Sequence, residues 1–152
     1  MAAPEPSSRP RSVLFACGLN SVRSPMAAYL LQRLGDPAVY VASAGVRKSD
    51  LDPFAVAAMQ EIGIDMAEHQ PITFEEIGDR EWLGFDLIVT LSPEAHHRAL
   101  DLINTPGPDV EYWPTPDPSA IEGSRDMRMA AYREVREQLI NRIRQRFSVD
   151  EA

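Results

Sequence analysis

Residues 12–25 read Ser12-Val-Leu-Phe-Ala-Cys17-Gly-Leu-Asn-Ser-Val-Arg23-Ser24-Pro25, and this stretch decides the fold. Residues 12–16 are a short apolar run rich in residues that favour β-structure, which predicts a strand. Proline is common in the first turn of a helix. After Pro25, apolar residues recur with helical spacing, at Met26, Tyr29, Leu30 and Leu34. The stretch therefore predicts a strand, a loop and a helix, in that order.

The loop between this strand and this helix has the features of an anion-binding site. Its backbone N–H groups can wrap around an oxyanion, and the helix N-terminus points at the same place. Cys17 is the only cysteine in the sequence, and this setting favours its thiolate form, a nucleophile. Arg23 supplies a planar fork of donors for two oxygens of a phosphate-like group. We therefore predict attack of Cys17 on a tetrahedral oxyanion, against the alternative of a buried, inert cysteine.

The rest of the chain alternates between strand-like and helix-like segments. Further strands are predicted at residues 39–43, 85–91 and 110–113. Further helices are predicted at 54–62, from residue 93, and near the C-terminus, where apolar residues recur from Tyr132 to Phe147. This alternation predicts a single α/β domain with a parallel sheet and helices on both faces. Ligands of such sheets bind at the carboxyl ends of the strands, where the Cys17 loop lies.

Length and composition narrow the function classes. The 152 residues suit one domain, which we place at residues 11–149, after a polar, proline-rich, disordered tail at residues 1–10. The net charge of −8 argues against nucleic acid as the main partner. No signal peptide or membrane span is recognised, which predicts a cytoplasmic enzyme with no membrane partner.

The cysteine and histidine content argues against a metal site. A single cysteine excludes an internal disulfide and a cysteine-based zinc cluster. His69, His96 and His97 show no ligand spacing, and we expect solvent-facing or capping roles for them. Between residues 125 and 146, seven arginines accompany three acidic residues, a local net charge of +4. We interpret these arginines as the solvated face of a helix.

A second catalytic candidate follows the predicted strand at residues 110–113. The segment Trp113-Pro-Thr-Pro-Asp117-Pro118 begins at the carboxyl end of this strand, so its loop can meet the Cys17 loop. Departure of a phosphoryl leaving group requires a proton, and Asp117 can supply it. The alternative interpretation of Asp117 is a turn residue between prolines.

With these residues in view, the chain resembles the low-molecular-weight protein tyrosine phosphatases and their arsenate reductase relatives. The resemblance rests on Cys17…Arg23-Ser24-Pro25, on Ser43-Ala44-Gly45 after the second strand, and on Asp117-Pro118 near the end. It implies an α/β fold with a four-stranded parallel sheet, a phosphate-binding loop after the first strand, no cofactor, and a cysteinyl-phosphate intermediate.

The resemblance also implies roles for individual residues. Cys17 is the expected nucleophile, Arg23 the clamp on the transition state, and Asp117 the general acid. Asn20 is expected to stabilise the loop, and Ser24 to donate a hydrogen bond to the thiolate. The substrate-binding residues are then Gly18, Leu19, Asn20, Ser21, Val22 and Ser24.

Several positions depart from the pattern of the family. Gly18 and Leu19 are exchanged relative to the usual loop order, and glycine permits backbone angles that leucine resists. Val22 occupies the position of a second, protective cysteine in many relatives. Ser119 and Ala120 follow Asp117-Pro118 where the phosphatases usually carry aromatic residues.

Three functions follow from these observations. The first is a phosphatase that hydrolyses phosphomonoesters on a phosphorylated protein (phosphotyrosine or a related residue) or on a small molecule. The second is an arsenate reductase that uses an external thiol or glutaredoxin, because Ser92 and Ala99 stand where thioredoxin-coupled relatives have cysteines. The third is an inactive oxyanion-binding regulatory domain.

Overall fold

The computed structural model describes residues 10–78, 81, 84–103 and 107–148. Its strands are β1 (Ser12–Cys17), β2 (Tyr40–Gly45), β3 (Leu87–Thr90) and β4 (Asp109–Tyr112). They form one four-stranded sheet in the order β2-β1-β3-β4, and every neighbouring pair is parallel. The predicted four-stranded parallel sheet is confirmed.

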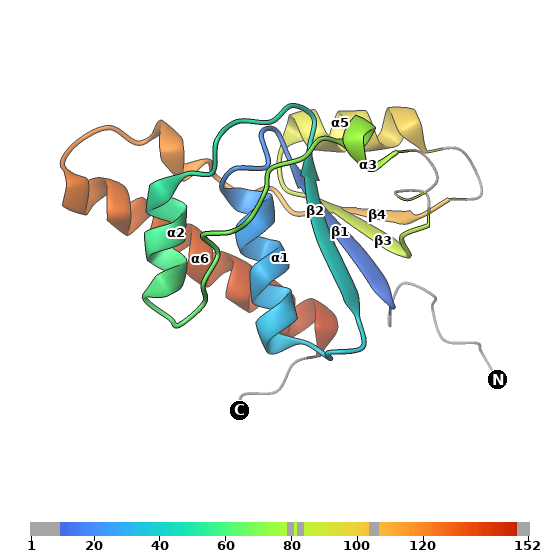
Figure 1. Ribbon diagram of the computed structural model, residues 1–152, viewed down its shortest axis with the longest axis horizontal. Coiled ribbons are helices and arrows are strands. Elements are labelled where there is room, and N and C mark those ends of the chain that lie inside the picture. The colour runs from blue at the N-terminus through green and yellow to red at the C-terminus, as the bar shows by residue number, and fades with distance from the viewer. Residues whose placement is uncertain (1–9, 79–80, 82–83, 104–106, 149–152) are drawn as a thin grey trace.

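Helices cover both faces of this sheet, as predicted (Figure 1). The helices are α1 (Arg23–Leu34), α2 (Pro53–Gln60), α3 (Phe74–Ile77), α5 (Pro93–Leu102) and α6 (Arg125–Phe147), with a short 3₁₀ helix η2 (Pro118–Ala120). Helices α1, α2 and α6 lie on one side of the sheet, and α3 and α5 lie on the other.

Strand β1 shows why the sheet is buried on both faces. Its side chains alternate in direction, so Val13, Phe15 and Cys17 join the core formed with α1, α2 and α6. Leu14 and Ala16 join the second core, which contains residues of α3 and α5. Such a strand needs a continuous apolar run rather than an alternating one, which the sequence provides.

The observed ends of the elements differ from the predicted ones by one to two residues, except that α6 begins at Arg125, seven residues before Tyr132. Helix α1 is the informative case. It begins at Arg23, two residues before Pro25. Proline lacks an N–H group, but the first four N–H groups of a helix have no partner within the helix, so Pro25 fits in the first turn. Val22 precedes the helix without a side-chain cap. The N–H groups of the first turn are therefore left open towards the loop.

The strand order places the loop after β1 at the point where the chain reverses direction across the sheet. From β1 the chain moves to β2 on one side, and β3 then adds on the other side of β1. In open α/β sheets the ligand crevice lies at this point, outside the carboxyl ends of the strands. The topology therefore leads to the Cys17 loop as the candidate site.

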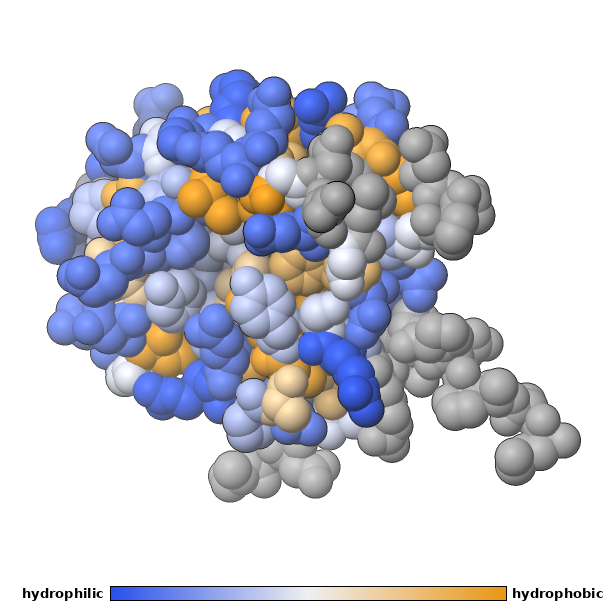
Figure 2. Space-filling view, turned by 45° about the vertical axis from the view of Figure 1, so that its right-hand side comes forward, coloured by the Kyte–Doolittle hydropathy of each residue, from blue (hydrophilic) through white to orange (hydrophobic). Residues whose placement is uncertain are grey.

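The molecular surface is mainly polar on the face that Figure 2 shows, with hydrophobic residues in small, separate patches. Among the described residues, no helix is both long and apolar enough to cross a membrane. Of the tail predicted at residues 1–10, only Pro10 is described, and it is buried. Residues 1–9 and 149 lie outside the described residues.

Candidate active site

The phosphate-binding loop (residues 17–24) turns its carbonyl groups outward, towards the segment that follows β2. The carbonyls of Cys17, Gly18, Leu19 and Ser21 accept hydrogen bonds from backbone N–H groups at residues 46, 47, 49 and 52, at 2.9–3.2 Å. Within the described residues, the backbone N–H groups of residues 18–22 donate no intramolecular hydrogen bond. These donors are therefore available to an anion bound inside the loop.

The end of β2 packs closely against the phosphate-binding loop, and Gly45 is the residue of closest approach. It pairs with Cys17 across the sheet. A Cβ atom at Gly45 would lie only 2.8 Å from the backbone nitrogen of Asn20. Only glycine permits this close approach, so the Ser43-Ala44-Gly45 motif supports the loop from behind.

Asn20 holds the loop together through its side chain, which is fully buried. Its Oδ1 accepts a hydrogen bond from the backbone N–H of Ile72 at 2.9 Å. An N–H group can only donate, so the amide nitrogen of Asn20 must face the other way. This nitrogen donates to the hydroxyls of Ser24 at 2.8 Å and Ser43 at 2.9 Å. These contacts support the loop-stabilising role predicted for Asn20.

The exchange of Gly18 and Leu19 puts no strain on the backbone. Among the described residues, the positive φ angle in this loop belongs to Asn20, at 53°, and neither Gly18 nor Leu19 has one. Asparagine tolerates the left-handed region better than most residues. Leu19 is 36% exposed at the rim of the loop.

Ser24 links Asn20 to the sulfur of Cys17. The Cys17 Sγ and Ser24 Oγ atoms are 2.9 Å apart, and both residues are buried. Because Ser24 accepts a hydrogen bond from Asn20, its own proton is available to donate. The sulfur lies nearer to this hydroxyl than the competing carbonyl of Ala44, which is 3.5 Å away. The geometry favours Ser24 as a donor to a Cys17 thiolate.

His69 contacts the same network, unlike the solvent-facing or capping role that we predicted. Its Nε2 lies 3.1 Å from Asn20 Oδ1, and its ring meets Tyr29 edge-on at 5.9 Å between centroids. Burial lowers the pKa of His69, against the opposing effect of the hydrogen bond to Asn20. Burial therefore favours the neutral imidazole, and Nε2 is the donor in the contact with Asn20, since Oδ1 can only accept.

Arg23 joins the loop to the segment after β4. Its side chain is 14% exposed, and its Nη1 donates to the carbonyl oxygen of Thr115 at 3.0 Å. Its Nη2 lies 4.0 Å from Oδ2 of Asp117. The other carboxylate oxygen of Asp117 accepts hydrogen bonds from the backbone N–H and the hydroxyl of Ser119. The structure thus brings Asp117 to the phosphate-binding loop, with Oδ2 on the side of Arg23.

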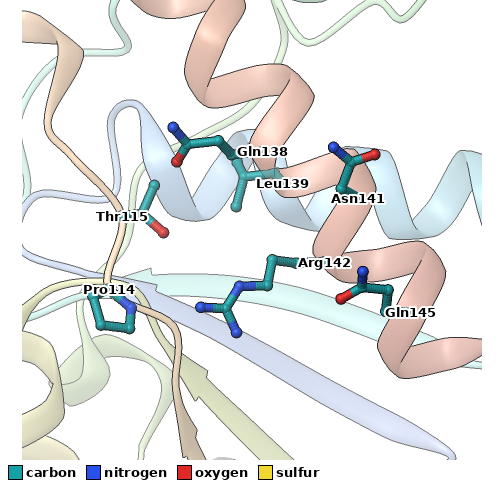
Figure 3. Close-up of a pocket in the computed structure, with 7 residues that line it drawn as sticks. All are labelled: Pro114, Thr115, Gln138, Leu139, Asn141, Arg142 and Gln145. Carbon is teal, nitrogen blue, oxygen red and sulfur yellow. The ribbon is translucent and has the colours of Figure 1, made fainter.

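Thr115, in the segment after β4, also borders a cavity between that segment and α6. Figure 3 shows the side chains around it, from the segment after β4 and from α6: Pro114, Thr115, Gln138, Leu139, Asn141, Arg142 and Gln145. No residue of the phosphate-binding loop lines this cavity. The cavity is therefore separate from the candidate active site.

Four contacts of the site escaped the sequence reasoning. They involve the Ser43 hydroxyl, His69, the Ile72 N–H group and the Thr115 carbonyl. Only Ser43 carried a signal, as part of the Ser-Ala-Gly motif. The other three are long-range contacts in which a backbone group or an isolated histidine meets the loop, and no local pattern marks them.

Replacing Asn20 with alanine should lower the free energy of unfolding by about 1–3 kcal/mol, because the Ile72 N–H group and two buried hydroxyls lose their partner. Urea unfolding monitored by circular dichroism measures this change. The control is Gln32→Ala, which removes an amide with one long contact, 3.4 Å, to the Val41 carbonyl. Equal stability losses in the two variants would contradict a special role for the Asn20 network.

Comparison with known proteins shows the family. Residues 12–149 match the family model of low molecular weight phosphotyrosine protein phosphatases. An arsenate reductase of Bacillus subtilis is 35% identical over 136 residues, covering 88% of this chain and 92% of the relative.

Solved structures show the same likeness. An arsenate reductase in the phosphate binding state aligns with a TM-score of 0.70 at 26% identity, covering 91% of this chain and 97% of the other. A protein tyrosine phosphatase aligns with a TM-score of 0.70 at 25% identity, covering 92% and 97%. Because the family model spans nearly the whole sequence, the protein belongs to the low molecular weight phosphotyrosine protein phosphatase family.

Proposed function

We propose that the protein hydrolyses phosphomonoesters through a covalent phosphate on Cys17. The observation that carries this proposal is the position of Asp117, whose Oδ2 lies 4.0 Å from the Arg23 guanidinium that borders the phosphate-binding loop. Hydrolysis of an ester requires a proton donor beside the anion site, and Asp117 fits that requirement. The substrate is a phosphorylated protein or a small phosphomonoester.

In the first step, the substrate phosphate enters the loop and accepts hydrogen bonds from the N–H groups of residues 18–22 and from Arg23. The Cys17 thiolate attacks phosphorus, so that an S–P bond forms as the P–O bond to the leaving group breaks. Asp117 gives its proton to the departing oxygen. The loop donors and Arg23 stabilise the charge on the equatorial oxygens in the transition state.

In the second step, the Asp117 carboxylate takes a proton from a water molecule as that water attacks phosphorus. The S–P bond breaks, inorganic phosphate leaves, and the Cys17 thiolate is restored. The hydroxyl of Ser24, 2.9 Å from the sulfur, stabilises the thiolate as a leaving group. The thiol must stay reduced, so we place the reaction in the cytoplasm.

Asp117→Asn should slow hydrolysis of substrates with poor leaving groups, such as phenyl phosphate, by roughly 10²–10⁴-fold. A leaving group of low pKa needs little protonation, so the loss in the cysteine phosphorylation step should be much smaller for such a substrate. Burst kinetics with a series of aryl phosphates measure this dependence. Affinity for inorganic phosphate should change little, because the loop amides and Arg23 bind it.

The matched control is Asp50→Asn, an exposed aspartate in the segment after β2, which should leave the leaving-group dependence as it is. An equal rate loss of Asp117→Asn for all leaving groups, or a matching loss of phosphate affinity, would make Asp117 a structural turn residue. Undetectable turnover in the wild-type protein with retained phosphate binding would favour the regulatory-domain alternative.

Arsenate reduction is the second candidate, and the similarity to arsenate reductases favours it. In this chain, Ser92 caps the N-terminus of α5 through its hydroxyl, and Ala99 is buried in that helix. Cys17 is the only thiol of the sequence, so an external thiol would have to supply the electrons. Oxidation of glutathione that depends on arsenate, measured beside aryl phosphate turnover, distinguishes the two candidates.

A further inference from the structure

The arginines of α6 differ in their partners. Arg133, Arg136 and Arg146 each form an ion pair with a glutamate. Arg125 and Arg128, in the first two turns, lie instead over the ring of Phe54, with their guanidinium carbons 5.5 and 4.4 Å from its centroid. Among the described residues, neither of these two forms an ion pair with a carboxylate. The positive charge of residues 125–146 is therefore neutralised only in part by ion pairs.

Phe54, Arg125 and Arg128, which we call the arginine platform, lie close to the phosphate-binding loop. Asp52 connects the two, because its backbone N–H donates to the Ser21 carbonyl at 3.2 Å. Phe54 follows only two residues later, and two residues span at most about 7 Å. Phe54, over which the two guanidinium groups lie, is therefore next to the segment that contacts the phosphate-binding loop.

Tyr132 places the platform beside Asp117 as well. Its hydroxyl donates to Asp52 at 2.6 Å, and its ring packs against Phe54 at 5.4 Å between centroids. The pKa of Tyr132 is raised by burial, by the hydrogen bond to Asp52, and by the charges of Asp52 and Asp117, and it is lowered by Arg128. Asp117 and Arg128 thus both act on this hydroxyl, and Asp117 in turn lies 4.0 Å from Arg23 of the phosphate-binding loop.

The platform has the chemistry of a carboxylate receptor. A guanidinium group that lies on an aromatic ring keeps its edge donors free for a carboxylate. Of the nearby acidic groups, Asp52 accepts hydrogen bonds from Phe54 and Tyr132, and the charge of Asp126 contributes to the raised pKa of Arg133. In a protein of net charge −8, two such arginines near the entrance attract an acidic group that would otherwise be repelled.

We propose that the arginine platform selects phosphorylated peptide substrates that carry an acidic side chain within two or three residues of the phosphorylated residue. This inference rests on the proposed phosphatase function and names its substrate class. The acidic side chain binds Arg125 and Arg128 while the phosphate occupies the loop at Cys17. Because the platform is partly exposed, the expected preference is modest, about 3- to 10-fold in kcat/KM.

The test uses phosphopeptides that are identical except for glutamate or glutamine at the positions two and three residues from the phosphorylated residue, on either side. Wild-type protein should prefer the glutamate peptides on at least one side. Arg128→Gln should reduce this preference, and Arg125→Gln with Arg128→Gln should remove it. Raising the ionic strength from about 0.05 to 0.5 M should also reduce it, since exposed charges are screened.

The control is Arg142→Gln, which removes an exposed arginine that likewise lies over an aromatic ring, that of Trp113 at 5.8 Å. The preference should persist in this variant. A wild-type protein without a preference, or a preference that survives loss of both platform arginines, would overturn the inference.

A binding measurement separates this inference from the proposed function. Titration of the same peptides into Cys17→Ser by calorimetry reports the preference without turnover. Absence of phosphate release by the wild-type protein would overturn the phosphatase proposal alone. Equal affinity of Cys17→Ser for the glutamate and glutamine peptides would overturn the inference alone.

Discussion

Cys17→Ser should abolish phosphatase turnover, by roughly 10⁴-fold or more, while the fold stays intact. A serine hydroxyl is a far weaker nucleophile than a thiolate, and no other thiol of the sequence can replace it. The substitution is nearly isosteric, and the serine hydroxyl can still form a hydrogen bond with Ser24, the partner of the sulfur at 2.9 Å. Steady-state hydrolysis of an aryl phosphate measures the loss, and circular dichroism measures the fold.

Binding of inorganic phosphate provides the control for Cys17→Ser. The loop N–H groups and Arg23 remain in place, so affinity for phosphate should be retained or rise slightly when the negative sulfur is removed. Turnover close to that of the wild-type protein would show that Cys17 is not the nucleophile. Loss of both phosphate binding and secondary structure would instead assign Cys17 a structural role.

Arg23→Lys should be the next most damaging change, with a loss of about 10²–10³-fold in kcat. Lysine keeps the positive charge, but it lacks the planar fork that contacts two equatorial oxygens. It also cannot reproduce the geometry in which one nitrogen of Arg23 donates to Thr115 while another faces Asp117. Comparison of kcat for the two proteins at saturating aryl phosphate measures the effect.

The matched control for Arg23→Lys is Arg33→Lys, on the same helix α1. Arg33 is exposed and donates to the backbone carbonyl of Gly63, away from the loop. Its replacement should leave kcat within about twofold, as expected of a surface change. Near-normal turnover in Arg23→Lys would show that Arg23 is not the clamp on the transition state.

The local part of the site could be predicted because its chemistry is contiguous in sequence. Cys17, Arg23 and Ser24 lie in one strand-loop-helix unit, and the backbone of such a unit directs N–H groups to a common point. The apolar run of β1 likewise predicts a strand buried on both faces. Prediction of the position of Asp117 required one further inference, namely that parallel strands place their carboxyl ends at the same edge of the sheet.

The supporting contacts could not be predicted in this way. The distant partners of Asn20 are Ser43, His69 and Ile72, which lie 23, 49 and 52 residues away. Two of them, His69 and Ile72, lie in the segment after α2. Their contact with Asn20 depends on the path that this segment takes past the phosphate-binding loop. The short elements α3 and η2 were also missed, because three or four residues do not show a periodic pattern.

The arginine-rich segment between residues 125 and 146 shows the same difference between what sequence and structure reveal. Sequence alone indicated a basic helix between residues 125 and 146, and we interpreted it as a solvated face. Ion pairing with Glu61 and Glu111 distinguishes Arg133, Arg136 and Arg146 from Arg125 and Arg128. Glu61 and Glu111 come from α2's end and from β4, so only the packing of these elements against α6 decides which arginines keep their donors free.

The sequence by itself determined the α/β alternation, the strand-loop-helix unit, and the placement of Cys17 and Arg23 within it, because these depend on hydrophobic periodicity and on backbone geometry over a few residues. Only the tertiary structure decided the orientation of the Asn20 amide, the contact of His69 with that amide, and the approach of Asp117 to Arg23. Those features depend on donors, acceptors and burial contributed by distant segments. Such contacts form only when the sheet brings the ends of its strands together.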